Sequence, residues 1–130
     1  MNNRDSSRAV LVVDRSGRIF FANRAAETIL GLNRSEITAR SYNAAEWKLT
    51  TVEGKPFPEG ELPFDLVMRD GKPVYEVELA IERPDGKRVI LSVNAAPIRD
   101  VKGTITSVTA SFTDTTKRKL TELALQESEQ

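Results

Sequence analysis

The chain has 130 residues and contains neither cysteine nor histidine. Without cysteine there are no disulfides, no thiolate metal ligands and no cysteine nucleophile. Without histidine, the most frequent general base and metal ligand is missing, and so is the usual haem ligand. The acidic residues also form no pair in an apolar setting. We therefore expect no catalytic residues and no metal site, and we expect that this chain is not an enzyme by itself.

The chain also lacks net charge and long apolar runs. Nineteen basic and nineteen acidic residues cancel, so no overall field attracts nucleic acid or anionic lipid. No run of about 18 apolar residues and no signal peptide occurs. A chain of this length is large enough for one hydrophobic core. These features predict one soluble, cytoplasmic domain with no nucleic-acid partner and no membrane contact.

The first half of the chain predicts a hairpin followed by short helices. Residues 9–13 are apolar, and a type I turn leads back to a second strand at 18–22. Asn23 is a suitable cap for a helix that reaches Leu30, and Asn33 or Ser35 caps another short turn. The segment 41–60 has no periodicity. A short helix over 62–69 follows, with Pro63 tolerated in its first turn.

Three strands with alternating apolar and polar residues follow this helix. Such alternation is typical of antiparallel strands with one buried face. Short helices between two groups of antiparallel strands predict an α+β fold, with the helices covering one face of the sheet. The apolar residues expected on the buried face are Val77, Leu79, Ile81, Val89, Leu91, Val93, Ala95, Val108, Ala110 and Phe112.

The last strand pattern changes into a charged helix at Asp114. The carboxylate of Asp114 is placed to accept from free N–H groups of the first helical turn. Arg118 lies one turn further on as an ion-pair partner, although an exposed pair contributes only about 0–1 kcal/mol. We predict that Asp114, Thr115 and Arg118 connect the sheet to the outgoing helix. The expected divisions are a linker at 1–8, a domain at 9–114 and a linker helix at 115–130.

Several short motifs occur together in a recognisable order. They are Val12-Val-Asp14 with Gly17-Arg-Ile19, Asn23-Arg-Ala-Ala26, Leu30-Gly31, Pro84-Asp-Gly86, Pro97-Ile-Arg-Asp100 with Gly103, and Phe112-Thr-Asp-Thr-Thr-Lys-Arg-Lys119. Over residues 9–119 this succession resembles a PAS sensory domain of the S-box type. The last motif is similar to the family's Asp-Ile-Thr signature, with Thr115 in place of the apolar residue. The tail 125–130 resembles the start of a following PAS repeat.

The resemblance implies a five-stranded antiparallel sheet in the order 2-1-5-4-3, with helices that enclose a cavity. It also implies a homodimeric sensory or regulatory module, excerpted from a multi-domain protein such as a sensor histidine kinase of a two-component phosphorelay. Such a module binds a small ligand or a partner subunit and relays the change through its C-terminal helix to an output domain of the same chain. The alternative is a ligand-free module that serves dimerisation and spacing.

The sequence does not identify a cofactor. Flavin-binding light sensors of the family carry a photoreactive cysteine near the position of 41–43, and this chain has none. They also place amide side chains on the last three strands, where this chain has Ile81, Leu91 and Phe112. Each unpaired polar group of a flavin would cost about 1–3 kcal/mol there. We therefore expect no cysteinyl-flavin photocycle, no tightly bound flavin of this type and no histidine-ligated haem.

The remaining candidates are a small apolar ligand, a ligand held by polar groups of 41–64, or a filled core. In that segment the ligand-cavity candidates are aromatic and polar residues, although aromatic residues in such positions usually pack the core. They are Tyr42, Asn43, Trp47, Thr50, Phe57 and Phe64. On the strands the candidates are Val77, Leu79, Ile81, Leu91, Val93, Val108, Ala110 and Phe112.

Overall fold

The structure is a computed structural model that describes residues 8–128. Within this range the strands are β1 (Ala9–Asp14), β2 (Ile19–Ala22), β3 (Val74–Glu82), β4 (Arg88–Arg99) and β5 (Ile105–Asp114). The helices of the same range are α1 (Arg24–Leu30), α2 (Arg34–Thr38), the 3-10 helix η2 (Ala45–Trp47), α3 (Pro63–Asp70) and α4 (Thr116–Ser128). The expected linker at 1–8 lies outside the described residues except for Arg8, and so do the last two residues of the expected terminal helix.

The strands form one sheet in the order β2-β1-β5-β4-β3, and every neighbouring pair runs antiparallel. This confirms the predicted α+β fold and its strand order. Leu79 lies opposite Leu91, and Val93 lies opposite Phe112. Because directly opposite residues share a face of the sheet, these apolar side chains gather on one side.

Short polar motifs set the helix boundaries. The side chain of Asn23 accepts a hydrogen bond from Ala26 N at 3.0 Å and caps α1. The same oxygen accepts from Val10 N at 3.0 Å, which joins the start of α1 to β1. Asn33 and Glu36 form a reciprocal capping box at the start of α2. The caps predicted from the sequence therefore fix where the helices leave the sheet.

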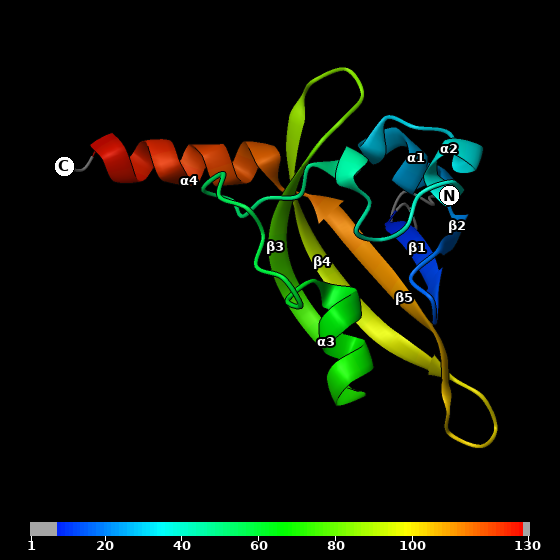
Figure 1. The fold of residues 1–130 in the computed structure, drawn as a ribbon. Helices are drawn as coiled ribbons and strands as arrows, with labels where there is room; N and C mark the ends of the chain where they lie inside the picture. Colours follow the sequence, from blue (N-terminus) through cyan, green and yellow to red (C-terminus); the bar gives the residue numbers. More distant parts are fainter. Residues whose placement is uncertain (1–7, 129–130) are drawn as a thin grey trace, which may run out of the picture.

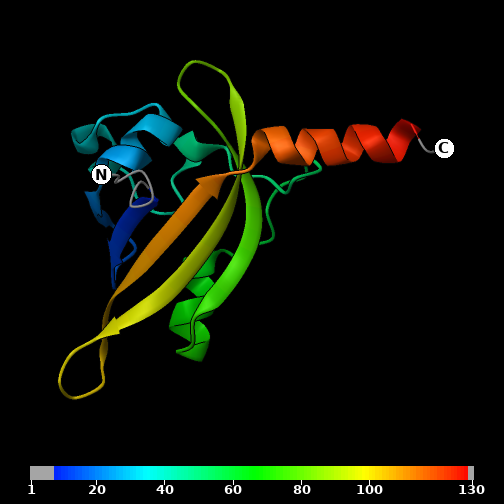
Figure 2. The same cartoon turned by 180° about the vertical axis from the view of Figure 1, so that it is seen from behind.

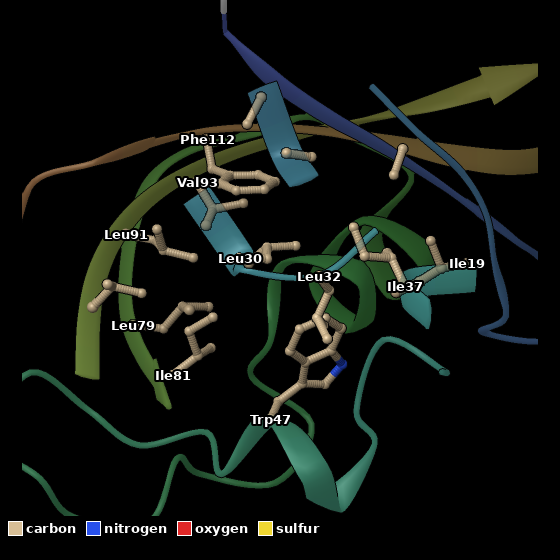
Figure 3. Packing of buried hydrophobic residues seen from close by; sticks show 14 of the residues in the cluster. Ile19, Leu30, Leu32, Ile37, Trp47, Leu79, Ile81, Leu91, Val93 and Phe112 are labelled. Atoms are coloured by element: carbon tan, nitrogen blue, oxygen red, sulfur yellow. The ribbon is translucent and has the colours of Figure 1, made fainter. Parts of the chain in front are cut away.

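The molecule has two layers (Figure 1). The helices α1, α2 and α3 cover one face of the sheet, and in the view from behind no described helix covers the reverse face (Figure 2). The hydrophobic core lies between the layers, where Trp47 lies across from Leu79 and Ile81 of β3 (Figure 3). Helix α4 runs away from the sheet. None of the described helices has both the length and the apolar character needed to cross a bilayer.

The edge strand β3 departs from the expected uninterrupted alternation. Its pairing with β4 shifts between Val74 and Val77, and Glu76 adopts a left-handed conformation with φ 55°. The N–H of Glu76 is satisfied by the side-chain oxygen of Asn94 at 2.7 Å. Further along the same edge, the backbone of Thr50 pairs with that of Ala80. Ala80 is buried, although the alternation places it on the outer face, and it lies opposite Ile90, which is buried as well.

Candidate functional site

An apolar cavity of about 100 Å³ lies between the sheet and the helices. All five strands, and the segments that cover this face of the sheet, contribute residues to its wall. The predicted candidates in this wall are Tyr42, Trp47, Phe64, Leu79, Ile81, Leu91, Val93, Val108, Ala110 and Phe112. The wall also contains residues that were not among the candidates, namely Leu11, Val13, Ile19, Leu30, Leu49, Leu62, Pro63 and Ala95.

The other candidates lie outside the cavity wall. The side chain of Asn43 accepts a hydrogen bond from the Ser41 hydroxyl at 3.0 Å. Phe57 is half-buried and packs against the margin of the core. Val77 is half-buried beside the irregular part of β3, and Thr50 pairs with the β3 edge. These residues belong to the margin of the domain and do not line the cavity.

The two polar side chains of the wall already have partners. The indole N–H of Trp47 donates to the carbonyl oxygen of Ser41 at 2.9 Å. The hydroxyl of Tyr42 donates to Oδ1 of Asp65 at 2.5 Å. The guanidinium of Arg40 lies 4.5 Å from the Trp47 ring centroid and further fixes this ring. The wall therefore offers a ligand apolar contacts and no unpaired side-chain donor.

The environment of Tyr42 favours its neutral phenol. Burial raises the pKa of Tyr42 to about 12, and the hydrogen bond to the Asp65 carboxylate adds to the shift. Because the folded-state pKa lies above the usual value near 10, this contribution to stability is complete below pH 10. It is lost as the pH rises through 12.

We expect one phenol of the folded protein to ionise near pH 12, and ultraviolet absorbance of tyrosinate to record it. The chain contains two tyrosines, so two variants assign the transition. Tyr42→Phe should abolish it, whereas Tyr75→Phe should leave it in place. A transition near pH 12 that persists in Tyr42→Phe would contradict the assignment.

A second candidate site is the connection between the sheet and α4, which we call the helix joint (Ile90, Asp114, Thr115 and Thr116). Thr115 is buried, and its N–H donates to the carbonyl oxygen of Ile90 at 2.8 Å. The N–H of Ile90 donates to the Thr116 hydroxyl oxygen, also at 2.8 Å. The carboxylate of Asp114 accepts from the N–H of Thr116 at 2.9 Å and from its hydroxyl at 2.5 Å. The start of α4 is thus bonded to β4, the strand between β5 and the edge strand β3.

The structure corrects the expected pairing of Asp114 with Arg118. Arg118 is exposed, and within the described residues it forms no ion pair with Asp114, whose carboxylate is turned toward Thr116. Instead, Lys119 pairs with Glu78 of β3 at 3.0 Å and with Glu122 at 3.3 Å. The hydrogen bonds to Glu78 and then to Glu122 raise the pKa of the Lys119 ammonium group. The ionic contact between α4 and the sheet is therefore one residue further along the helix than predicted.

Residues that line the cavity and residues that hold α4 are neighbours along the same strands. Leu91 lines the cavity, and its neighbour Ile90 bonds to the start of α4. On β3, Leu79 lines the cavity, and its neighbour Glu78 pairs with Lys119. Because successive side chains of a strand point to opposite faces, a displacement of the cavity wall moves the backbone that holds α4.

Comparison with known proteins agrees with this arrangement. The family model described as PAS domain matches residues 7–117, and the chain belongs to this family. PAS domains are sensory modules. No curated protein matches the sequence.

Solved structures similar to this chain include the PAS domain of a protein from Colwellia psychrerythraea, with 19% identity and a TM-score of 0.69 over 85% of this chain and 88% of that one. A light-oxygen-voltage domain whose structure concerns a flavin analogue is 18% identical, with a TM-score of 0.70 over 98% and 92% of the two chains. The light-oxygen-voltage domain of a blue-light activated histidine kinase, Erythrobacter litoralis EL346, is also 18% identical, with a TM-score of 0.65 over 82% and 94%. At these identities the likeness establishes the fold.

These comparisons correct the expectation about the cofactor. The apolar residues Ile81, Leu91 and Phe112 predict that flavin of the light-sensor type does not bind tightly. The chain nevertheless has the fold of light-oxygen-voltage domains, one of which was studied with a flavin analogue. Three strand positions are therefore too narrow a basis for excluding this class of cofactor. Because the sequence contains no cysteine, a cysteinyl-flavin photocycle has no support.

Proposed function

We propose that this domain is a cytoplasmic sensory module that binds a small apolar ligand in its cavity and transmits binding to an output domain through α4. The observation that carries the proposal is that the cavity-lining Leu79 and Leu91 adjoin Glu78 and Ile90, which hold α4. A ligand that displaces Leu79 or Leu91 moves the strand segments to which α4 is bonded.

The cavity itself supports an uncharged ligand of modest size. Its volume is about 100 Å³, and an engineered apolar cavity of about 150 Å³ binds benzene. The polar groups of Tyr42 and Trp47 are already bonded to Asp65 and Ser41. A polar ligand group buried here without a partner would cost about 1–3 kcal/mol. These properties favour a ligand with a mainly apolar surface.

Benzene serves as a probe of this proposal. We expect it to bind the protein, to shift methyl resonances of the cavity wall in NMR spectra, and to shift amide resonances of the helix joint. Ala110→Leu extends a side chain into the cavity, so binding should weaken at least tenfold, or about 1.4 kcal/mol. Ala96→Leu is the matched control, because Ala96 follows the cavity-lining Ala95 and faces the other side of β4.

Two outcomes would reject the cavity as a ligand site. One is the absence of benzene binding to the unmodified protein. The other is equal binding to the Ala110→Leu variant. Wall resonances that shift while those of Ile90, Thr115 and Thr116 stay in place would reject the relay and leave the ligand site.

A ligand-free module for dimerisation and spacing is the alternative function. Leu120 and Leu123 support it, because they are 55% and 42% exposed and lie three residues apart on one side of α4. In a longer chain these residues provide a contact for the same helix of a second copy. Native mass spectrometry that finds a dimer without any small molecule, together with no response of α4 to benzene, would favour this alternative.

The output domain is proposed by analogy with one similar structure. The light-oxygen-voltage domain of a blue-light activated histidine kinase shares the fold of this chain. We propose that the parent protein is a histidine kinase of a two-component system, in which α4 leads toward the kinase. Autophosphorylation of the parent protein, measured with and without the probe, tests this assignment.

A further inference from the structure

We propose that the hydrogen bond between Tyr42 and Asp65 controls access to the cavity. In this inference the bond holds the N-terminal half of α3 against the segment 41–60, and its loss opens the cavity, which is already partly open to solvent, further to molecules from outside. The inference rests on the proposed function, because it concerns the regulation of the same cavity.

The cavity wall opposite the sheet is made of two separate segments. Tyr42 belongs to the irregular segment, and Phe64 belongs to α3, yet both line the cavity. Their ring centroids are 4.3 Å apart, at an interplanar angle of 36°. The same pair of segments is joined by the bond from the Tyr42 hydroxyl to Asp65 Oδ1 at 2.5 Å. The wall therefore parts at this point if α3 moves away.

Tyr42 is fixed on the side of the sheet. Its backbone N–H donates to the carbonyl oxygen of Gly17 at 2.9 Å, in the turn between β1 and β2. Gly17 has φ 94°, and a Cβ atom on this residue would lie 2.9 Å from the Tyr42 ring. The close approach of the ring thus requires glycine in the turn. Since Tyr42 is held in this way, α3 is the part that moves.

The two ends of α3 are attached differently. At the C-terminal end Val67 is fully buried against Ala95 and Val108, and Arg99 donates to the carbonyl oxygen of Gly71 at 2.7 Å. At the N-terminal end Pro63 is buried and Phe64 packs against the core, while Asp65 accepts from Tyr42 and, through its other oxygen, from Leu62 N at 3.2 Å.

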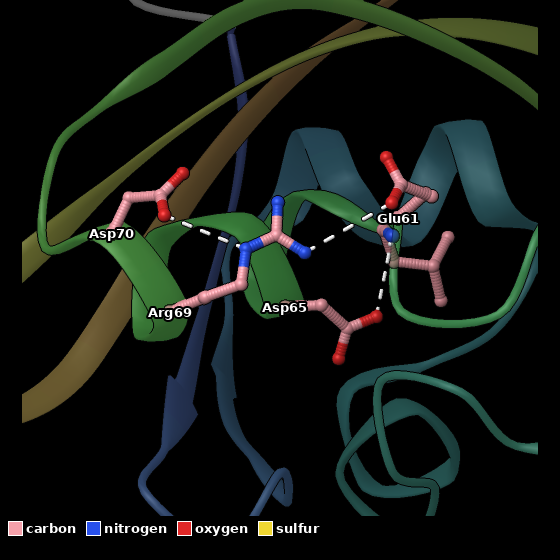
Figure 4. Close-up of polar contacts among 5 residues, drawn as sticks. Glu61, Asp65, Arg69 and Asp70 are labelled. Atoms are coloured by element: carbon pink, nitrogen blue, oxygen red, sulfur yellow. Dashed lines mark hydrogen bonds and ion pairs between the residues drawn. The ribbon is translucent and has the colours of Figure 1, made fainter.

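The ion pairs of α3 do not connect it to the rest of the domain. Arg69 lies between Glu61 and Asp70, at 3.9 Å and 3.4 Å, and both partners lie next to or within α3 (Figure 4). All three side chains are more than half exposed, so these pairs contribute little. Among residues 8–128, the bond from Asp65 to Tyr42 is therefore the hydrogen bond that ties the side chains of α3 to the segment 41–60.

Trp47 provides a measurement that needs no ligand. It is the only tryptophan of the chain, it is 5% exposed, and it lines the cavity. Collisional quenching of its fluorescence by acrylamide therefore reports how often the cavity opens. Tyr42→Phe keeps the ring contact with Phe64 and removes the hydroxyl. We expect this variant to raise the quenching rate constant about tenfold, as expected for the loss of a hydrogen bond to a charged group.

Two further variants separate this effect from a general loss of stability. Asn33→Ala removes the cap of α2, which packs on β2 away from α3, and lowers thermal stability without touching the Tyr42–Asp65 bond. We expect quenching in this variant to stay at the wild-type level. Asp65→Ala should raise quenching, and the double variant Tyr42→Phe/Asp65→Ala should raise it by less than the product of the single effects, because both remove the same bond.

The outcomes distinguish this inference from the proposed function. Quenching that stays unchanged in Tyr42→Phe, or that rises equally in Asn33→Ala, overturns the role of the bond. Quenching that rises in Tyr42→Phe, together with faster exchange of bound benzene, supports both proposals. If quenching rises in Tyr42→Phe but benzene binds neither the wild type nor this variant, the control of access is supported and the proposal of an apolar ligand is rejected.

Discussion

Replacing Ile19 by Ala should lower the free energy of unfolding by about 2–5 kcal/mol, the usual cost of truncating a buried isoleucine. Ile19 is 1% exposed, packs in the core and forms part of the cavity wall. The removed side chain would enlarge the existing cavity, because pairing with Val13 holds the backbone of Ile19 on β1. We therefore expect a value in the upper half of this range, measured by urea unfolding.

The adjacent residue supplies the control. Phe20 lies in the same strand but is 54% exposed, so Phe20→Ala should change stability by no more than about 0.5 kcal/mol. Equal losses in the two variants would contradict the placement of Ile19 in the core. A loss below about 1 kcal/mol for Ile19→Ala would show that the strand can close the space.

Replacing Thr116 by Val should detach the first turn of α4 from the sheet. The Thr116 hydroxyl accepts from the N–H of Ile90 and donates to the Asp114 carboxylate. Valine has nearly the same shape but can do neither, so the N–H of Ile90 loses its partner and the Asp114 carboxylate keeps only the backbone N–H of residue 116. We expect a loss of about 1–3 kcal/mol, together with faster hydrogen exchange at the amides of Ile90 and Thr115.

Thr121→Val is the matched control for the helix joint. Its hydroxyl donates to the carbonyl oxygen of Lys117 within α4 and makes no contact with the sheet. Exchange at the Ile90 amide should therefore stay unchanged in this variant. In the parent protein, an Asp114→Ala variant with unaltered output and dimer geometry would reject the proposed relay.

The sequence predicts most of the fold because its local signals agree with its tertiary contacts. Asn23 and Asn33 cap the helices as expected, and Pro63 begins α3. Alternation on the last strands places Leu91 and Phe112 on the buried face. Alternation does not predict that a residue on the face opposite the core is also buried. Ile90 is buried, and its N–H bonds to Thr116 at the start of α4. This contact depends on where α4 begins relative to β4, which the strand pattern does not specify.

The candidate site was predicted less completely, for reasons specific to each segment. Residues 9–13 are all apolar, so periodicity cannot tell which of them, such as Leu11 and Val13, face the cavity. Leu49 lies in a segment without a periodic pattern. The sequence pattern predicts only that Asp65 lies in the first turn of a helix. Its bond to Tyr42 joins positions 23 residues apart. A contact of this kind follows from the packing of an irregular segment against a helix, which sequence pattern does not encode.

The left-handed residue in β3 has a consequence for how this protein meets other chains. Glu76 bends the exposed border of the sheet, and Asn94 occupies its N–H from within the same molecule. A straight border would present a row of open donors and acceptors, on which an extended peptide or a misfolded copy can build. The irregular backbone at Glu76 interrupts this row, and the carboxylate of Glu76 adds a negative charge to the border.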